Sequence, residues 1–266
     1  MNQRHTFIAA VVTFLCLFVI SSAAGTVAVP APFFYGYVTD NNTTTTVIAG
    51  PGSYTQGHIS ASVFAMPNAG SLMATSCSTG STYPNNCVTG GNVSITYYFT
   101  VTGGNVGDPV NVLLDGLLSG SVSGNGTGVN ASESMSATLS VSDNGNTVSY
   151  TLQGGCIDVC SWQQQWKGTL AIPMAVGDIG TVTINNDLNM SLVVYPNVTQ
   201  VGSGSAYADP YIYVDPNDPN ASLYSIVVSP GIGNVPLGST PEPPSLMLVG
   251  SGLAGLAGFI SRKTNL

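Results

Sequence analysis

The sequence predicts an all-β protein built as a single β-sandwich, and three observations favour this fold class. β-branched and aromatic residues alternate with polar ones through most of the chain, while a helical period is nearly absent. Gly, Asn, Asp and Pro separate the alternating runs, as is typical of tight turns. No clear linker divides these roughly 200 residues, enough for one sizeable core. Many short strands favour a jelly-roll or Ig-like sandwich, with an open barrel as the alternative.

The turn residues between the runs predict how neighbouring strands connect. Asp143-Asn144-Gly145-Asn146 gives the strongest hairpin signal, because Asn-Gly suits the positive φ angles of a type I′ turn. Asn185-Asn186 predicts a second hairpin, Gly103-Gly104 a turn, and the Gly/Ser/Asn-rich stretch 119–130 an exposed loop. The expected strands are Phe33–Thr39, Thr44–Ala49, His58–Ala65, Leu72–Thr75, Val93–Val101, Val110–Leu118, Ser134–Val141, Thr147–Leu152, Trp162–Ile172, Gly180–Ile184, Leu188–Tyr195, Tyr207–Val214 and Leu223–Val228.

The two ends of the chain are apolar and are expected to lie outside the sandwich. Arg4, an apolar run over residues 7–20 and the small residues Ser22-Ala23-Ala24 are typical of a secretory signal peptide. At the other end, residues 243–261 carry no charge and would span about 28 Å as a helix, close to a bilayer core. The basic pair Arg262-Lys263 then predicts a transmembrane helix with a cytoplasmic end, and an exported body.

These features divide the chain into four parts. Residues 1–24 form a signal peptide with its helix, and cleavage leaves a mature chain that begins near Gly25, or after Ala28. Residues 25–229 form the extracellular β-sandwich. Residues 230–240 form a stalk in which Gly and Pro alternate with small residues. Residues 241–266 form a sorting and anchor segment.

The last segment resembles the PEP-CTERM sorting signal of Gram-negative bacteria that produce exopolysaccharide. The resemblance rests on Pro241, Glu242 and Pro243, the Gly-rich apolar run 246–260, and the basic residues Arg262 and Lys263, in that order. It implies processing by an exosortase, anchoring in the membrane through the C-terminal helix before processing, and delivery to the cell surface or extracellular matrix. A plain C-terminal anchor is the alternative, but it does not require the Pro-Glu-Pro.

The charge of the predicted domain excludes two kinds of partner. Eleven acidic residues and the single Lys167 leave the domain with a net charge of 1 − 11 = −10. Nucleic acids are bound through Lys and Arg, which displace counterions from phosphates. Anionic lipid surfaces also attract basic segments. We therefore expect no nucleic acid partner and no docking of this domain on an anionic membrane.

Four cysteines remain after signal cleavage, namely Cys77, Cys87, Cys156 and Cys160. An even number in an exported chain predicts disulfides, for which three connectivities are open. The local pairs Cys77–Cys87 and Cys156–Cys160 are favoured because each flanks turn-forming residues. A metal site is the alternative, although the single mature histidine, His58, lies far from the cysteines in the sequence.

No group of residues predicts catalysis, so we expect a protein without enzyme activity. A Ser-His-Asp triad would have to use His58, and no G-x-S-x-G elbow occurs. A glycosidase needs two carboxylates across a groove, but most acids here lie in turns, where Asp commonly bonds its own backbone. Glu133 borders a predicted strand, without a partner acid among aromatic residues.

The best candidates for carbohydrate binding are Trp162, Gln164 and Trp166. Their spacing places them on one face of a strand, where two indoles and an amide would stack on sugar rings and bond their hydroxyls. Buried tryptophans are the alternative, since they are ordinary components of a sandwich core.

A calcium site is a second candidate for binding. Asp209, Asp215 and Asp218 lie close together in the sequence and offer the oxygen ligands that Ca²⁺ prefers. The EF-hand pattern is missing, and an Asx-Pro turn between two strands is the alternative. No other cofactor is expected.

The expected function is that of an exported, surface-sorted protein with a structural or adhesive role in the extracellular polysaccharide or biofilm matrix. Export and β architecture follow from the residues, whereas the association with exopolysaccharide is implied by the resemblance. A carbohydrate-binding module is the alternative, and a hydrolase of matrix polymer is a third reading.

Overall fold

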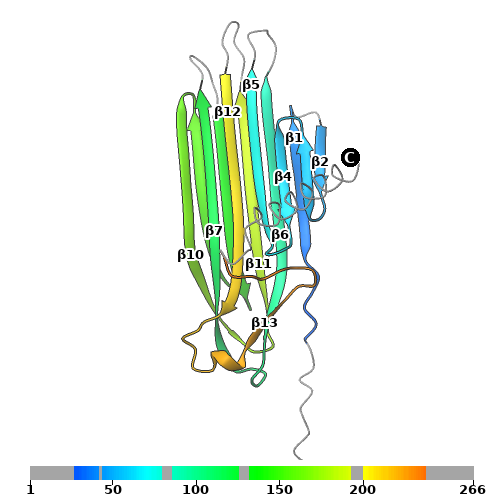
Figure 1. Cartoon of the computed structure of the whole chain (residues 1–266), viewed down its shortest axis with the longest axis vertical. Coiled ribbons are helices and arrows are strands. Elements are labelled where there is room, and N and C mark those ends of the chain that lie inside the picture. Colours follow the sequence, from blue (N-terminus) through cyan, green and yellow to red (C-terminus); the bar gives the residue numbers. More distant parts are fainter. Residues whose placement is uncertain (1–26, 42–43, 80–85, 126–131, 193–199, 238–266) are drawn as a thin grey trace, which may run out of the picture.

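The computed structural model describes residues 27–41, 44–79, 86–125, 132–192 and 200–237. These residues form two antiparallel β-sheets whose long strands run along the long axis of the molecule (Figure 1). The all-β class and the two-sheet architecture agree with the predicted sandwich. The expected signal helix, the C-terminal helix and the sorting residues lie outside the described ranges. The described ranges contain no helical segment with the length and hydropathy that spanning a bilayer requires.

Each sheet has a path of six strands. Sheet A has the order β2-β1-β6-β11-β8-β9, with β13 also paired to β6. Its strands are β1 (Phe33–Asp40), β2 (Thr44–Ile48), β6 (Cys87–Thr102), β8 (Ser132–Asp143), β9 (Asn146–Ile157), β11 (Ile179–Leu192) and β13 (Ser225–Val228). Sheet B has the order β10-β7-β12-β5-β4-β3. Its strands are β3 (Gly52–Gln56), β4 (Ile59–Phe64), β5 (Gly70–Thr79), β7 (Pro109–Asn125), β10 (Cys160–Ala175) and β12 (Gln200–Val214); a short 3₁₀ helix, η1 (Ala221–Leu223), follows β12.

Two predicted turns are confirmed by the backbone angles. Asn144 and Gly145 have φ angles of 44° and 88°, and they join β8 to β9 as the Asn-Gly signal predicts. Gly103 and Gly104 have φ angles of 92° and 64° in the connection between β6 and β7. These turns need positive φ, which their residues adopt at low cost.

The predicted hairpin at Asn185-Asn186 is wrong, because β11 runs without a break through both residues. Asn185 faces outward, while Asn186 is fully buried and its Nδ2 donates to the Ser71 Oγ (2.8 Å) and carbonyl oxygen (3.1 Å) of sheet B. A polar partner in the opposite sheet thus lets an asparagine occupy an inward position of a strand.

The predicted loop at residues 119–130 is also wrong where the structure describes it, because β7 continues to Asn125. Gly116, Gly120 and Gly124 all face the interior, in register with the buried residues between them. A Cβ atom at Gly116 or Gly120 would overlap Leu139 or Met135 of sheet A. These glycines make room for large side chains from the opposite sheet, so they belong to the core pattern. The short strand β3 was also not expected.

Both predicted disulfides are present, and each joins one sheet to the other. Cys77 of β5 is bonded to Cys87 of β6, and Cys156 of β9 is bonded to Cys160 of β10. The carboxylate of Glu133 lies near the second bond and beside Gly202, where a Cβ atom would come within 2.7 Å of it. The two disulfides lie at the same end of the sandwich, because Cys77 and Cys160 occupy the same level of sheet B. Cys77 of β5 pairs with Gly202 of β12, Gly202 pairs with Gly124 of β7, and Gly124 pairs with Cys160 of β10.

Candidate functional site

Three exposed aromatic side chains follow one another along the outer face of β1. Phe33, Tyr35 and Tyr37, which we call the aromatic ladder, are 60%, 53% and 38% exposed. The alternate residues Phe34 and Val38 face the core, as the period of a strand requires. The rings of Phe33 and Tyr35 are stacked, with centroids 6.5 Å apart and planes inclined by 6°. The ladder therefore exposes two parallel rings, and Tyr37 extends this line of aromatic side chains.

Polar side chains continue from each aromatic residue across the outer face of sheet A. The strand registers define three such ranks, each with one aromatic residue on β1 followed by residues of β6, β11, β8 and β9. The ranks are Tyr37, Asn92, Asp187, Ser136 and Gln153; Tyr35, Ser94, Asn185, Thr138 and Thr151; and Phe33, Thr96, Thr183, Ser140 and Ser149. Every rank thus places hydroxyl or amide groups beside an aromatic ring.

Hydrogen bonds hold the centre of this face in one arrangement. Asn92 Nδ2 donates to Asn185 Oδ1 (2.9 Å) and to Asp187 Oδ1 (2.8 Å). Asn185 Nδ2 and Ser136 Oγ donate to Asp187 Oδ2, at 2.8 and 3.4 Å. Side chains that are already ordered lose little further entropy when a ligand binds.

A groove of about 580 Å³ opens beside Tyr37, at the end of the ladder. Gly90 and Gly155 contribute no side chain there, and a Cβ atom at Gly90 would come within 2.8 Å of Asn189 Oδ1. A smaller hollow of about 340 Å³ next to it is lined by Gln153, Asp187 and Asn189, among others. The outer face of sheet A therefore combines a line of aromatic side chains with a neighbouring depression.

The electrostatics of this face suit an uncharged ligand. Asp187 is the single charged residue in the three ranks, and its carboxylate accepts hydrogen bonds from three neighbouring side chains. Lys167, the one lysine or arginine in the described part of the chain, belongs to β10 of sheet B. An anionic polymer would meet no cation on the ladder face, whereas hydroxyl groups would meet many donors and acceptors.

The predicted tryptophan pair lies elsewhere and faces inward. Trp162 and Trp166 do share one side of β10, but both are half-buried and pack against the core. Trp166 stacks on Tyr150 of β9, with ring centroids 4.3 Å apart and planes inclined by 11°. Gln164, between them, is exposed. We call Tyr150, Trp162 and Trp166 the tryptophan seam, because they close the edge between the two sheets.

The three aspartates of the predicted calcium site are not gathered. Asp209 lies on the outer face of β12, where Tyr207 Oη (2.9 Å) and Asn68 Nδ2 (3.2 Å) donate to its carboxylate. Burial raises the pKa of Asp209, and the two hydrogen bonds oppose that shift. Six residues of strand, or about 20 Å, separate it from Asp215.

The other two aspartates bond their own loop. Asp215 Oδ1 accepts from the backbone N–H of Asn217 (2.9 Å), and Asp218 Oδ1 accepts from that of Asn220 (2.9 Å). These are the Asx turns that the sequence offered as the alternative.

Sequence reasoning did not single out the aromatic ladder. Its signal was present, since Phe33, Tyr35 and Tyr37 alternate within an expected strand. The adjacent Phe34 made both sides of that strand look apolar, so the outward side could not be identified. The sequence instead favoured Trp162 and Trp166, whose spacing places them on one face of a strand.

Comparison with known proteins identifies the C-terminal segment. Residues 239–263 match the family described as the PEP-CTERM protein-sorting motif. They include all the sorting residues that the sequence predicts, Pro241, Glu242, Pro243, Arg262 and Lys263, which lie outside the described residues. The chain is thus an exported protein that is sorted to the cell surface.

The β-sandwich itself is not assigned to a family by these comparisons. No curated protein matches the sequence. Among solved structures, a chain of the T13 IBDV viral particle aligns over 82% of this protein and 84% of its own length. Its identity is 9% and its TM-score is 0.13, so this likeness supports no argument about fold or function.

Proposed function

We propose that this protein is a non-enzymatic, adhesive component of the extracellular matrix that binds a neutral polysaccharide along the aromatic ladder. The observation that carries the proposal is the line of three exposed aromatic rings beside ranks of hydroxyl and amide groups. Contiguous exposed apolar side chains often mark a surface that contacts a partner. Sorting to the cell surface supports it, because the ladder is then exposed to matrix polymer.

The geometry of the ladder favours an extended polymer. Alternate residues of a strand are about 6.6 Å apart, and the stacked rings of Phe33 and Tyr35 follow this spacing. Successive sugar rings of one chain would lie over successive aromatic rings, while their hydroxyl groups reach Asn92, Ser94 and Thr96 of β6. A single small sugar would use only part of this line.

Binding can be tested with the matrix polysaccharide of the producing bacterium and with neutral and anionic polymers of similar length. We expect affinity electrophoresis to show retention by a neutral polymer. Tyr35→Ala should weaken binding about tenfold, or ~1.4 kcal/mol, because it removes the central ring. Tyr211→Ala is the matched control, since Tyr211 stacks on Tyr213 (5.2 Å) on the outer face of sheet B.

Equal loss in both variants, or no loss in Tyr35→Ala, would contradict binding at the ladder. The release of reducing ends from the polymer by the wild-type protein would contradict a non-enzymatic role. Binding that disappears with Trp166→Ala but not with Tyr35→Ala would favour the alternative, a carbohydrate-binding module that uses the tryptophan pair.

Processing by an exosortase belongs to the same proposal. The surface form of the protein should lack the residues that follow Pro241-Glu242-Pro243, and intact-mass measurement would detect this. A surface form that keeps its full C-terminus would indicate a plain membrane anchor.

A further inference from the structure

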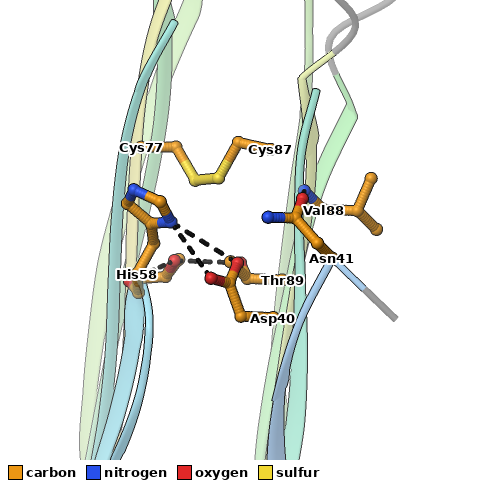
Figure 2. The surroundings of a disulfide bond; sticks show 8 residues. Asp40, Asn41, His58, Cys77, Cys87, Val88 and Thr89 are labelled. Carbon is orange, nitrogen blue, oxygen red and sulfur yellow. Dashed lines mark hydrogen bonds and ion pairs between the residues drawn. A yellow bond between two sulfur atoms is a disulfide. The ribbon is translucent and has the colours of Figure 1, made fainter. Parts of the chain in front are cut away.

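The fold brings His58 next to the disulfide between Cys77 and Cys87, although the sequence separates them. A ring nitrogen of His58 and the two sulfur atoms all lie within 4.8 Å of one another. Figure 2 shows the imidazole beside the sulfur pair, with Asp40 beneath it. Asp40 and Cys87 belong to sheet A, whereas His58 immediately precedes β4 and Cys77 lies on β5 of sheet B. His58, Cys77 and Cys87 therefore form one group of potential metal ligands, and Asp40 extends it through its contact with His58.

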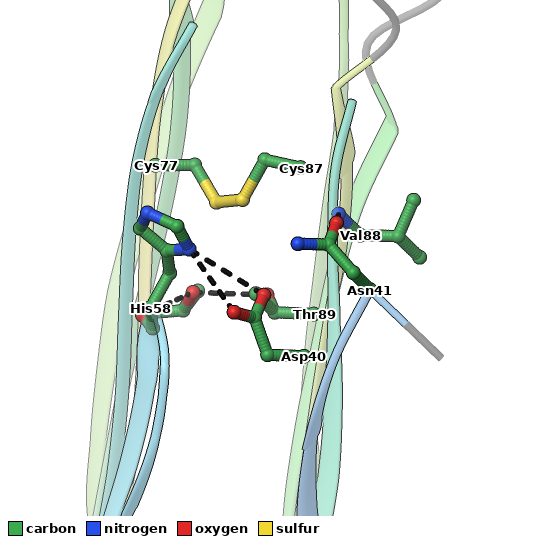
Figure 3. Close-up of polar contacts among 8 residues, drawn as sticks. Asp40, Asn41, His58, Cys77, Cys87, Val88 and Thr89 are labelled. Carbon is green, nitrogen blue, oxygen red and sulfur yellow. Dashed lines mark hydrogen bonds and ion pairs between the residues drawn. A yellow bond between two sulfur atoms is a disulfide. The ribbon is translucent and has the colours of Figure 1, made fainter. Parts of the chain in front are cut away.

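Asp40 and His58 already stand at the separation that two ligands of one metal ion require. His58 Nδ1 is 3.3 Å from Asp40 Oδ2 and 3.4 Å from Oδ1, as the dashed lines of Figure 3 mark. Zinc bonds of about 2.0 Å to nitrogen and oxygen place two tetrahedral ligands about 3.3 Å apart. The pair therefore matches one edge of a tetrahedral site.

The surrounding structure fixes this corner. Thr75 Oγ1 donates to the carbonyl oxygen of His58 (3.0 Å) and lies 2.9 Å from Thr89 Oγ1 of the other sheet. Gly57 has a φ angle of 52°, and a Cβ atom there would overlap the Asp40 carboxylate. A glycine is thus needed both for the turn and for the close approach of Asp40.

We propose that Asp40, His58, Cys77 and Cys87 form a site for a zinc-type divalent cation in the reduced protein, and that metal binding and the disulfide are alternative ways to close this corner. Two thiolates, one imidazole and one carboxylate are ligands that zinc accepts in tetrahedral geometry. This inference does not depend on polysaccharide binding.

The two states are connected by a balanced exchange. A dithiol reductant gives two electrons and two protons to the disulfide and is itself oxidised to a disulfide, leaving two thiols on the protein. The cation then displaces one proton from each thiol and binds the two thiolates. Cys77 and Cys87 are 0% and 4% exposed once bonded, so the cation must bind before the disulfide closes. Cytosolic thiols are kept reduced, and an exported chain therefore starts in the state that can bind metal.

The test uses the full chain in a Cys156→Ser/Cys160→Ser background, because Cys156, Cys160 and Glu133 form a second group of potential ligands. The protein is reduced with a phosphine, unfolded, and refolded without oxygen in the presence of Co²⁺, a spectroscopic substitute for zinc. We expect one Co²⁺ per folded chain, with thiolate-to-metal charge transfer and tetrahedral d–d bands. The oxidised protein should show neither signal.

Three variants distinguish this site from adventitious binding. Adding Cys77→Ser/Cys87→Ser should abolish the charge-transfer band, and Asp40→Asn should weaken binding at least tenfold. His58→Ala should also weaken it at least tenfold; His58 is half exposed, so this variant is expected to fold. Equal affinity in His58→Ala and its parent, a band that survives loss of both cysteines, or failure of the reduced chain to fold with Co²⁺ would each overturn the proposal.

Discussion

The aromatic ladder and the tryptophan seam have similar sequence patterns, but the ladder is exposed to solvent and the tryptophans of the seam pack against the core. Phe33, Tyr35 and Tyr37 are two residues apart on β1, and Trp162 and Trp166 are four apart on β10, so each set shares one face of its strand. Phe33, Tyr35 and Tyr37 face the solvent from an inner strand of sheet A, whereas Trp162 and Trp166 face the core from the edge strand of sheet B. Alternation tells which side chains share a face, but the partner sheet decides which face is buried.

The surroundings of the two groups explain this difference. Opposite the two tryptophans of the seam, β9 provides Tyr150 as the stacking partner of Trp166 and Gly154 as space for the indole of Trp162. Among the described residues, neither sheet covers the outer side of β1, so its rings stay exposed. The seam is therefore expected to contribute stability and the ladder to contribute binding. The following experiments test that division, from the largest expected effect to the smallest.

Truncation of the seam should cost far more stability than truncation of the ladder. Trp166→Ala is expected to lower the free energy of unfolding by about 3 kcal/mol, because it removes the ring that packs on Tyr150 and on the core. Tyr35→Ala should change it by less than about 1 kcal/mol, since its side chain is mostly exposed. Urea unfolding followed by circular dichroism measures both, and similar losses would remove the distinction.

Two adjacent glycines of β9 provide a finer test of the packing of the seam. Gly154→Ala should destabilise by about 1–3 kcal/mol, because the new methyl group overlaps the indole of Trp162. In Gly155→Ala the nearest heavy atom to the new group, the Glu133 carbonyl oxygen, is at an ordinary distance of 3.5 Å. This control should be neutral or slightly stabilised. Equal stability of the two variants would show that Trp162 does not pack on Gly154.

Glu133 should make the disulfide-bonded end of the sandwich sensitive to pH. Its side chain is buried, and among the described residues its carboxylate oxygens have no hydrogen-bond partner, so burial raises the pKa of Glu133. A group with a raised pKa in the folded state contributes stability below its ordinary pKa of 4.5. That contribution is lost as the pH rises through the folded-state pKa.

Glu133→Gln should remove this dependence. The variant should gain stability over the wild type at neutral pH, and the gain should shrink toward pH 4, where the wild-type carboxyl group is protonated. Thermal unfolding at several pH values would show it. A gain that stays the same at every pH would contradict the role of ionisation.

The smallest effect is spectroscopic and separates the two regions directly. The wild-type protein carries its two tryptophans in the seam, so a polysaccharide bound to the ladder should leave their emission nearly unchanged. Tyr35→Trp places a third indole on the ladder, and its emission should shift to the blue when the polymer covers it. A large shift in the wild type would instead place the ligand at the seam.

The sequence by itself determined the local features of this protein. Alternation of side chains predicts the strands, and Asn144-Gly145 predicts its hairpin, because each signal depends on residues close in the chain. The two disulfides pair cysteines that are 10 and 4 residues apart, and they were predicted for the same reason. The sorting segment is likewise a linear signal, readable without a fold.

Tertiary structure decided every feature that depends on the opposite sheet. Asn186 continues β11 because Ser71 of sheet B accepts its hydrogen bonds, and the inward glycines of β7 fit large residues of β8. The pairing of β4 with β5 brings His58 near Cys77, and Cys87 of sheet A joins them only when the two sheets pack. Such packing depends on how strands that are distant in the sequence are aligned and which faces they turn toward each other. The two-residue alternation of side chains along a strand determines neither the partner strand nor the buried face.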